Sequence, residues 1–259
     1  MKEGCKSIRG LFMTMVLLAF FACGQDENVE LKKISHHIKE LNKKSCIDED
    51  CAEVKLSFPV FEGKRNLADK INLHIKQQMI MYLGWGESEL EVDSLQYAVN
   101  NFIKKFKNIK EEFPDSHQSW YVDAQGAVTY SNSKFLSLSM LSDSYTGGAH
   151  SNQIMLFMNF DLDRGVLVKK DDIILNETKL LAKAKNAFRK YHDVDPEKSL
   201  AEDGRFFLKD GEFFLPAAIG YEDSELVLFY NSYEIAPYAM GQTELRIPLD
   251  QLEGVVLQP

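Results

Sequence analysis

The hydrophobic period of this chain changes at Pro114, and that change limits the folds open to it. Before Pro114, apolar residues recur at helical spacing through residues 66–83 and 93–113. After it, apolar and polar residues alternate in short runs, as in strands with one buried face. Because helices and strands are grouped rather than strictly alternating, we predict one compact α+β body with a largely antiparallel mixed sheet and flanking helices.

The expected elements follow from these periods and from the residues that interrupt them. Residues 54–60 alternate as a strand, and Pro59 indicates an edge or end position. Asn66 is the expected cap of the first helix, Pro114 closes the second, and Gly126 is expected in the turn of a hairpin. The other expected strands are 120–123, 127–130, 135–141, 154–160, 206–215, 226–230 and 244–248, with a helix at 176–191 and a helical turn at 249–252.

Two sequential subdomains are expected after a leader and a tether. The predicted divisions are a signal peptide at 1–22, a lipidated Cys and tether at 23–50, an N-terminal α+β subdomain at 51–115, and a C-terminal β-rich subdomain at 116–259. Within the tether, four apolar residues at helical spacing predict a short surface helix: Leu31, Ile34, Ile38 and Leu41.

The first 23 residues predict where the protein is found. A basic start precedes an apolar run from Leu11 to Ala22, and Cys23 follows at once. The run is too short to cross the ~30 Å hydrocarbon core as a helix. Phe20-Phe21-Ala22-Cys23 resembles a bacterial lipobox, in which the Cys is acylated. We therefore expect an exported protein that Cys23 anchors by lipid in the bacterial envelope, in the outer membrane on its periplasmic or surface face.

The charge of the chain narrows the choice of partners. The net charge is −9, and the predicted signal peptide takes three bases and one acid with it, which leaves −11. So acidic a chain argues against nucleic acid and against adhesion to anionic lipid, and favours cationic soluble partners. We expect a monomer, attached to a membrane only through its N-terminal lipid.

Two cysteines remain after the signal peptide and Cys23. An exported protein with two thiols close in sequence, Cys46 and Cys51, predicts a local disulfide. The alternative is a metal site that uses His36 and His37 upstream, but the pair lacks a second Cys or His pair to complete a tetrahedral zinc site. We predict no metal and no cofactor.

Familiar catalytic and phosphate-binding motifs do not occur in the sequence. It has no Gly-x-Gly-x-x-Gly, Walker loop, His-Glu-x-x-His or Gly-x-Ser-x-Gly. Asp161-x-Asp163-x-Gly165 resembles half of a calcium loop, but we interpret it as a turn at a strand end. We interpret His192 and the residues after it as a helix cap and turn. The members of a Ser-His-Asp triad need only converge in space, so that alternative stays open.

Two irregular segments are the candidate site. The first, which we call the Gly-Gly-His loop (residues 145–150), places adjacent glycines between two strands, where they permit left-handed backbone and close approach. The second, the Tyr-Pro-Tyr segment (residues 233–241), carries two tyrosines around a proline, and tyrosine is a common contact residue. The alternative is that both are strained loops that pack on each other, with their polar groups satisfied internally.

The order of these two segments resembles the RsiV-type extracellular domain family, a pair of domains of unknown function. The resemblance rests on Tyr-Thr-Gly-Gly-Ala-His followed by Tyr-Glu-Ile-Ala-Pro-Tyr-Ala-x-Gly, and it extends over roughly residues 54–256. It implies a mixed sheet with flanking helices and no established catalytic role. The same paired domains occur in lysozyme-sensing anti-sigma factors, beside the catalytic domain of some peptidoglycan deacetylases, and in lipoproteins.

Our first hypothesis is a non-enzymatic envelope lipoprotein that binds lysozyme, which is cationic, or a peptidoglycan-related ligand. The predicted binding residues are Tyr145, Thr146, Gly147, Gly148, His150, Tyr233, Pro237 and Tyr238. A rival hypothesis is a cell-wall hydrolase with His150 as general base and Asp143 or Glu234 as its partner. A third is a structural lipoprotein that only packs against envelope partners.

Overall fold

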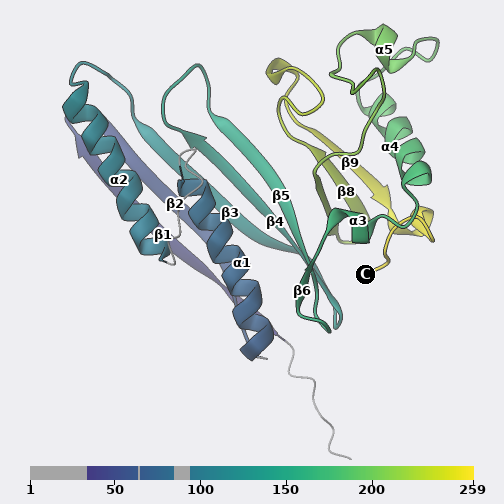
Figure 1. Ribbon diagram of the computed structural model, residues 1–259, viewed down its shortest axis with the longest axis horizontal. Coiled ribbons are helices and arrows are strands. Elements are labelled where there is room, and N and C mark those ends of the chain that lie inside the picture. Colours follow the sequence, from purple (N-terminus) through teal and green to yellow (C-terminus); the bar gives the residue numbers. More distant parts are fainter. Residues whose placement is uncertain (1–33, 64, 85–93) are drawn as a thin grey trace, which may run out of the picture. The chain divides into compact units, whose positions relative to one another are not determined.

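The computed structural model describes residues 34–63, 65–84 and 94–259, so the predicted signal peptide and Cys23 lie outside the described residues. Six strands form one sheet in the order β1-β2-β3-β4-β5-β6, and three form a second in the order β7-β8-β9 (Figure 1). Neighbouring strands are antiparallel throughout except for β2 and β3. The predicted α+β class and its largely antiparallel sheet are confirmed.

The first sheet carries two long helices on one face (Figure 1). Its strands are β1 (Ser35–Ile47), β2 (Asp50–Glu62), β3 (Trp120–Ser131), β4 (Phe135–Tyr145), β5 (Asn152–Asp161) and β6 (Val166–Val168). The helices α1 (Arg65–Leu83) and α2 (Leu95–Glu112) join β2 to β3, as a parallel crossover requires. Val99, Phe102 and Phe106 of α2 are buried in the core between helices and sheet, as their spacing predicts.

The second sheet has its own core and its own helices. It comprises β7 (Ala218–Glu222), β8 (Glu225–Tyr230) and β9 (Thr243–Pro248), with α3 (Lys170–Ile173), α4 (Glu177–Tyr191), α5 (Leu200–Asp203) and the 3₁₀ helices η1 (Tyr238–Met240) and η2 (Leu249–Leu252). Leu180, Ala184 and Phe188 bury the apolar side of α4. Asn176 caps the start of α4 and His192 its end, so both predicted boundaries are confirmed.

Buried polar side chains join the two sheets. The Ser137 hydroxyl of β4 accepts a hydrogen bond from the Tyr221 amide of β7 at 3.1 Å. The Asn159 side chain of β5 donates to the Ile219 carbonyl at 2.9 Å. Because unpaired buried backbone groups are costly, these bonds fix the position of β7 on the first sheet.

The predicted tether ends earlier than the sequence indicated, because residues 35–47 form β1 instead of a linker with a surface helix. β1 pairs with β2 along its whole length, from Ser35 opposite Glu62 to Ile47 opposite Asp50. The Cys46–Cys51 disulfide joins the two strands beside their turn, which confirms the predicted bridge. The helical spacing misled because most side chains of β1 are exposed, so no apolar alternation marked the strand, whose backbone bonds to β2.

The predicted hairpin at Gly126 is wrong, since β3 is one continuous strand with a bulge between Val128 and Tyr130. A Cβ at Gly126 would lie 3.0 Å from Met140 Sδ and 3.2 Å from Pro59 Cδ. The glycine therefore serves close packing inside a strand rather than a turn.

Two further boundaries differ from the predictions. Residues 206–215 are not a strand and hold only an isolated bridge between Lys209 and Glu212, because their aromatic residues fill the core around α4. The first sheet also continues past the predicted subdomain boundary at residue 115, since β3 pairs with β2. Pro59 lies beyond Ser57, where the pairing of β2 with β3 ends, as its missing amide hydrogen requires.

Candidate functional site

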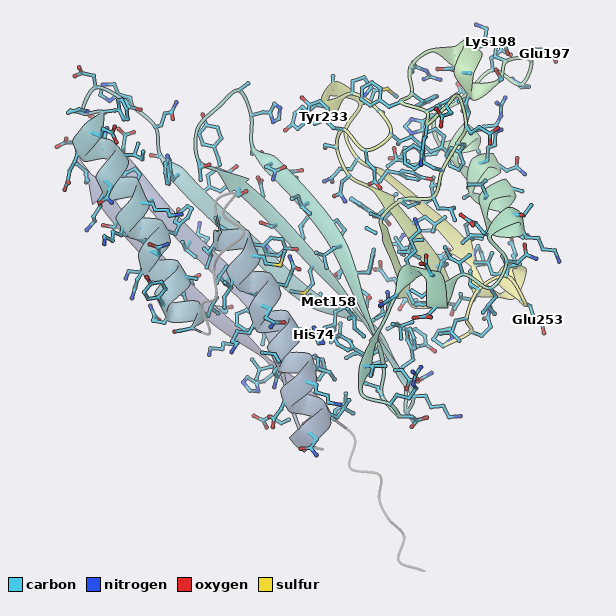
Figure 2. The ribbon with its side chains drawn as sticks, viewed as in Figure 1. His74, Met158, Glu197, Lys198, Tyr233 and Glu253 are labelled. Carbon is cyan, nitrogen blue, oxygen red and sulfur yellow. A yellow bond between two sulfur atoms is a disulfide. The ribbon has the colours of Figure 1, made fainter. Side chains whose placement is uncertain are left out.

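The Gly-Gly-His loop and the Tyr-Pro-Tyr segment lie against each other, although they come from different sheets. The His150 ring stacks on the Tyr238 ring with centroids 3.8 Å apart and planes 17° apart. His150 Nε2 lies 3.2 Å from the Tyr233 hydroxyl. The Tyr233 and Tyr238 rings are 5.6 Å apart, which completes a cluster of three rings. Figure 2 shows Tyr233 on the loop that faces the connection between β4 and β5.

Two glycines with positive φ angles determine the backbone path of the Gly-Gly-His loop. Gly147 has φ +108° and Gly148 has φ +114°, values that side chains with a Cβ rarely adopt. The Tyr145 hydroxyl donates to the Gly148 carbonyl at 2.9 Å and closes the loop on itself. The predicted role of the paired glycines in fixing the loop therefore agrees with its geometry.

The Tyr-Pro-Tyr segment is anchored by two polar side chains at its start. The Asn231 amide bonds both backbone groups of Met155 in β5, at 2.8 and 2.9 Å. The Glu234 carboxylate accepts from the amides of Ala217 and Asn231, at 2.7 and 2.8 Å. Between them, Tyr233 has φ +66° and is 56% exposed. A tyrosine in left-handed backbone is strained, so its neighbours hold it in place.

The hydrogen bonds of His150 define how its ring can act. Nδ1 lies 2.8 Å from the Ser151 carbonyl, which can only accept, so Nδ1 carries the hydrogen. In the neutral ring, Nε2 therefore accepts from the Tyr233 hydroxyl. The suggested carboxylate partners bond elsewhere: Asp143 accepts from Tyr121 and Gln153, and Glu234 accepts from backbone amides. The described residues thus give His150 a hydroxyl partner rather than a carboxylate.

Tyr121 belongs to the same surface, and the sequence analysis missed it. Its ring stacks on that of Tyr145 at 6.3 Å, and its hydroxyl donates to Asp143 at 3.1 Å. Partial burial and then the nearby Asp143 carboxylate raise the pKa of the Tyr121 hydroxyl, despite an opposing hydrogen bond from Ser151. Tyr121 lies opposite Tyr145 in the β3–β4 register, so its place follows from strand pairing, which the sequence pattern did not reveal.

A cavity of about 290 Å³ lies beside the Gly-Gly-His loop. Tyr145, Thr146, Gly147 and His150 line one side of it, and the end of α1 lines another. Tyr82 of α1 donates to the Met140 carbonyl at 3.0 Å, and burial raises the pKa of its hydroxyl, which keeps that wall neutral. The predicted loop residues thus form part of a concave surface.

The other singled-out residues belong to turns, to the Tyr-Pro-Tyr segment itself, or to the part of the chain outside the described residues. Asp161 Oδ1 accepts from the amides of Asp163 and Arg164, which confirms a turn at a strand end. Pro237 immediately precedes η1 and Cys46 and Cys51 form the disulfide, whereas Cys23 is outside the described residues. The described residues hold no group of three His, Cys, Asp or Glu side chains arranged for a metal. In that same part of the chain, no helix is both long and apolar enough to cross a membrane.

Together, fold and site define a class: two successive α+β units, each with its own sheet, that bring one loop each to a shared surface. Residues 45–153 match the family model described as "Deacetylase PdaC", and residues 167–250 match "Protein of unknown function (DUF3298)". These two matches follow each other along the chain and fit the paired-domain family that the two loop motifs resemble.

A curated relative shares part of the chain. It is the peptidoglycan-N-acetylmuramic acid deacetylase PdaC of Bacillus subtilis (strain 168), which is 23% identical over 163 residues. That match covers 61% of this chain but 33% of the relative, so the chain spans about a third of the length of the curated relative that it matches.

Two crystal structures of DUF3298 proteins show the same fold. The one from Bacteroides fragilis has a TM-score of 0.69 at 20% identity and covers 88% of this chain and 95% of its own. The one from Pseudomonas aeruginosa PAO1 has a TM-score of 0.65 at 19% identity and covers 87% and 94%. At such identities the likeness concerns the fold alone.

Proposed function

We propose that this chain is a non-enzymatic binding module of the bacterial cell envelope, and that the ring cluster of His150, Tyr233 and Tyr238 is its recognition surface for a peptidoglycan-related ligand. The observation that carries this proposal is the exposed contact between the two loops, in which Tyr233 keeps strained backbone. Strain of this kind clusters at binding and catalytic sites, and a tyrosine adopts such backbone less readily than an aspartate. The name of the B. subtilis relative supports a peptidoglycan-related ligand.

A binding role fits His150 better than a hydrolytic one. A general base needs hydrogen-bond reach to its substrate and usually a partner that orients it. The carboxylates of Asp143 and Glu234, the two suggested partners, accept hydrogen bonds from other groups. Stacked rings with exposed edges, in contrast, supply contact area at low entropic cost.

Lysozyme is the second candidate ligand, and the charge of the chain favours it. A net charge of −9 attracts cationic proteins over distances up to the Debye length. Binding driven in this way weakens steeply as salt rises, whereas contact with a neutral glycan does not.

We also propose that the protein is exported and attached through a lipid on Cys23 to the outer membrane, on its periplasmic or surface face. The support is the basic, apolar and Cys pattern of the first 23 residues. Mass spectrometry of the protein from membranes would detect acylated Cys23, and protease treatment of intact cells would distinguish the two faces.

The test of function uses the chain from residue 24 onwards, which contains every described residue. We expect purified peptidoglycan sacculi to capture it at both low and high salt. If only lysozyme binds in calorimetry, and only at low salt, the second candidate replaces the first. Capture by neither ligand would overturn the proposed function, and release of sugar from the sacculi would overturn its non-enzymatic character.

A further inference from the structure

The cavity beside the Gly-Gly-His loop is small. Its volume of about 290 Å³ lies at the lower end of the ~300–1,000 Å³ usual for small-molecule pockets. It can therefore enclose one compact group of a ligand rather than a length of polymer.

The described residues that line this cavity include no Asp, Glu, Lys or Arg. In a chain with 27% charged residues, such a lining disfavours a cationic ligand. A cation placed there would lose its hydration without gaining a carboxylate from these residues. The lining therefore fits a neutral group.

The cavity lining combines two kinds of wall, one apolar and one polar. Phe102 and Val122 form a buried apolar part, and Met81 and Ile154 are exposed apolar residues of the same lining. Hydroxyl and amide groups supply the polar part, from Ser142, Ser144, Thr146 and Asn152. A group that combines a methyl with hydrogen-bonding atoms matches both walls.

Ser142 gives this polar wall a specific binding capacity. Its side chain is on β4, only 3% exposed, and part of the cavity lining. A serine hydroxyl has one donor hydrogen and two acceptor lone pairs. Ser142 can thus donate to, or accept from, a group that enters the cavity.

Building on the proposed binding function, we infer that this cavity holds one neutral N-acetylated sugar residue of a glycan. The acetamido methyl packs on the apolar part, and the amide and ring hydroxyls bond the polar wall. The aromatic residues Tyr145 and His150, which also line the cavity, offer ring faces to the C–H groups of the sugar.

The test compares two matched oligosaccharides by NMR titration of the chain from residue 24 onwards. The trimer of N-acetylglucosamine is neutral, and the trimer of glucosamine lacks the acetyl groups and is cationic. We expect the acetylated trimer to bind at least ~10-fold more tightly, because the described residues of the lining offer no carboxylate to an ammonium group. Since the whole chain is acidic, attraction by net charge alone would give the opposite order, and that order would overturn the inference.

A pair of serine variants locates the binding. Ser142→Ala removes the hydroxyl without adding an atom, and we expect ~5-fold weaker binding of the acetylated trimer. Ser139→Ala makes the same change on β4 at a position that does not line the cavity, and we expect no effect. Circular dichroism checks that both variants fold. If Ser142→Ala does not, perturbed amides at Ser144 and Thr146 in the unaltered chain still locate the sugar.

The outcomes separate this inference from the proposed function. If sacculi capture the chain but the acetylated trimer perturbs no residue of the cavity, the inference is wrong and the binding function stands. Equal loss of affinity in both serine variants would also overturn the inference. If neither sacculi nor the trimer binds, both fail.

Discussion

Two turns of the first sheet solve different problems. At the turn between β1 and β2, the Cys46–Cys51 disulfide joins the strands, and the Lys110 ammonium of α2 lies 2.8 Å from the Asp50 carboxylate. These two side chains are only 6% and 12% exposed, and Lys110 also donates to the carbonyls of Pro114 and Ser116. The polar groups at the turn between β1 and β2 thus bond one another inside the protein.

The Gly-Gly-His loop between β4 and β5 instead keeps polar side chains at the surface. Its His150 is exposed and contacts Tyr233, which lies 83 residues further along the chain. Instead of a disulfide or a buried ion pair, positive φ angles and stacked rings hold it. The turn between β1 and β2 therefore stabilises the fold. The Gly-Gly-His loop instead keeps its polar side chains at the surface, with strained backbone.

The largest expected effect on stability comes from the buried ion pair at the turn between β1 and β2. Lys110→Met leaves the buried Asp50 carboxylate without its lysine, with the exposed His117 ring 3.7 Å away, and we expect the free energy of unfolding to fall by about 3–5 kcal/mol. Denaturant titration measures this loss. The double variant Lys110→Met/Asp50→Leu removes both charges and is expected to recover much of it. If the single variant Lys110→Met were as stable as the unaltered chain, the Lys110–Asp50 ion pair would not stabilise the turn between β1 and β2.

The disulfide comes next. Replacing Cys46 and Cys51 together by Ser opens a short loop, and we expect a loss of about 2 kcal/mol in the free energy of unfolding. Capture by sacculi is expected to stay unchanged in the folded variant. If the folded variant also lost capture, the turn between β1 and β2 would contribute to binding together with the Gly-Gly-His loop.

Tyr233→Asn is expected to act in the opposite direction on stability. Asparagine tolerates left-handed backbone better than tyrosine, so we expect the free energy of unfolding to rise by up to about 1 kcal/mol while ligand binding falls. The matched control is Tyr97→Asn in α2, because Tyr97 is 57% exposed and Tyr233 56%. We expect the control to be slightly less stable and to bind normally. A destabilised Tyr233→Asn variant with normal binding would reverse the comparison.

The smallest expected effect concerns His192, which is half-buried whereas His150 is exposed. Burial, and then the nearby Arg205, lower the pKa of His192 from its usual 6.5. The unfolded chain therefore binds this proton more readily, so stability is complete above pH 6.5 and declines as the pH falls through the lowered pKa. His192→Gln should remove this part of the pH dependence of the melting temperature. An unchanged pH profile would contradict the assignment.

Local patterns predicted the regular elements well. The spacing of Leu180, Ala184 and Phe188 predicted α4, and Asn176 predicted its first turn, because a helix is determined by neighbours in sequence. The Cys pair likewise predicted its own disulfide. The strands β1 and β7 were missed because β1 is mostly exposed and β7 is buried on both faces, so neither shows the alternation of a half-buried strand. Residues 206–215 were assigned wrongly because their aromatic residues fill the core without forming a strand.

The candidate site was predictable only in part. Paired glycines and clustered tyrosines are unusual in a sequence, and they indicated both loops, which the structure brings into contact. Tyr121 and Ser142 carry no such signal, because the register of β3 with β4 and the packing of α1 and α2 on the sheet place them. Their binding role, like that of the two loops, stays a prediction.

The most direct measurement is quantitative capture of the chain by peptidoglycan sacculi with and without the ring cluster. We expect the double variant His150→Ala/Tyr238→Ala to fold normally and to lose most of its capture, since it removes two of three clustered rings. The control Tyr97→Ala, which removes an exposed ring from α2, is expected to be captured like the unaltered chain. Equal capture of all three proteins would contradict the claim that the two loops form the recognition surface.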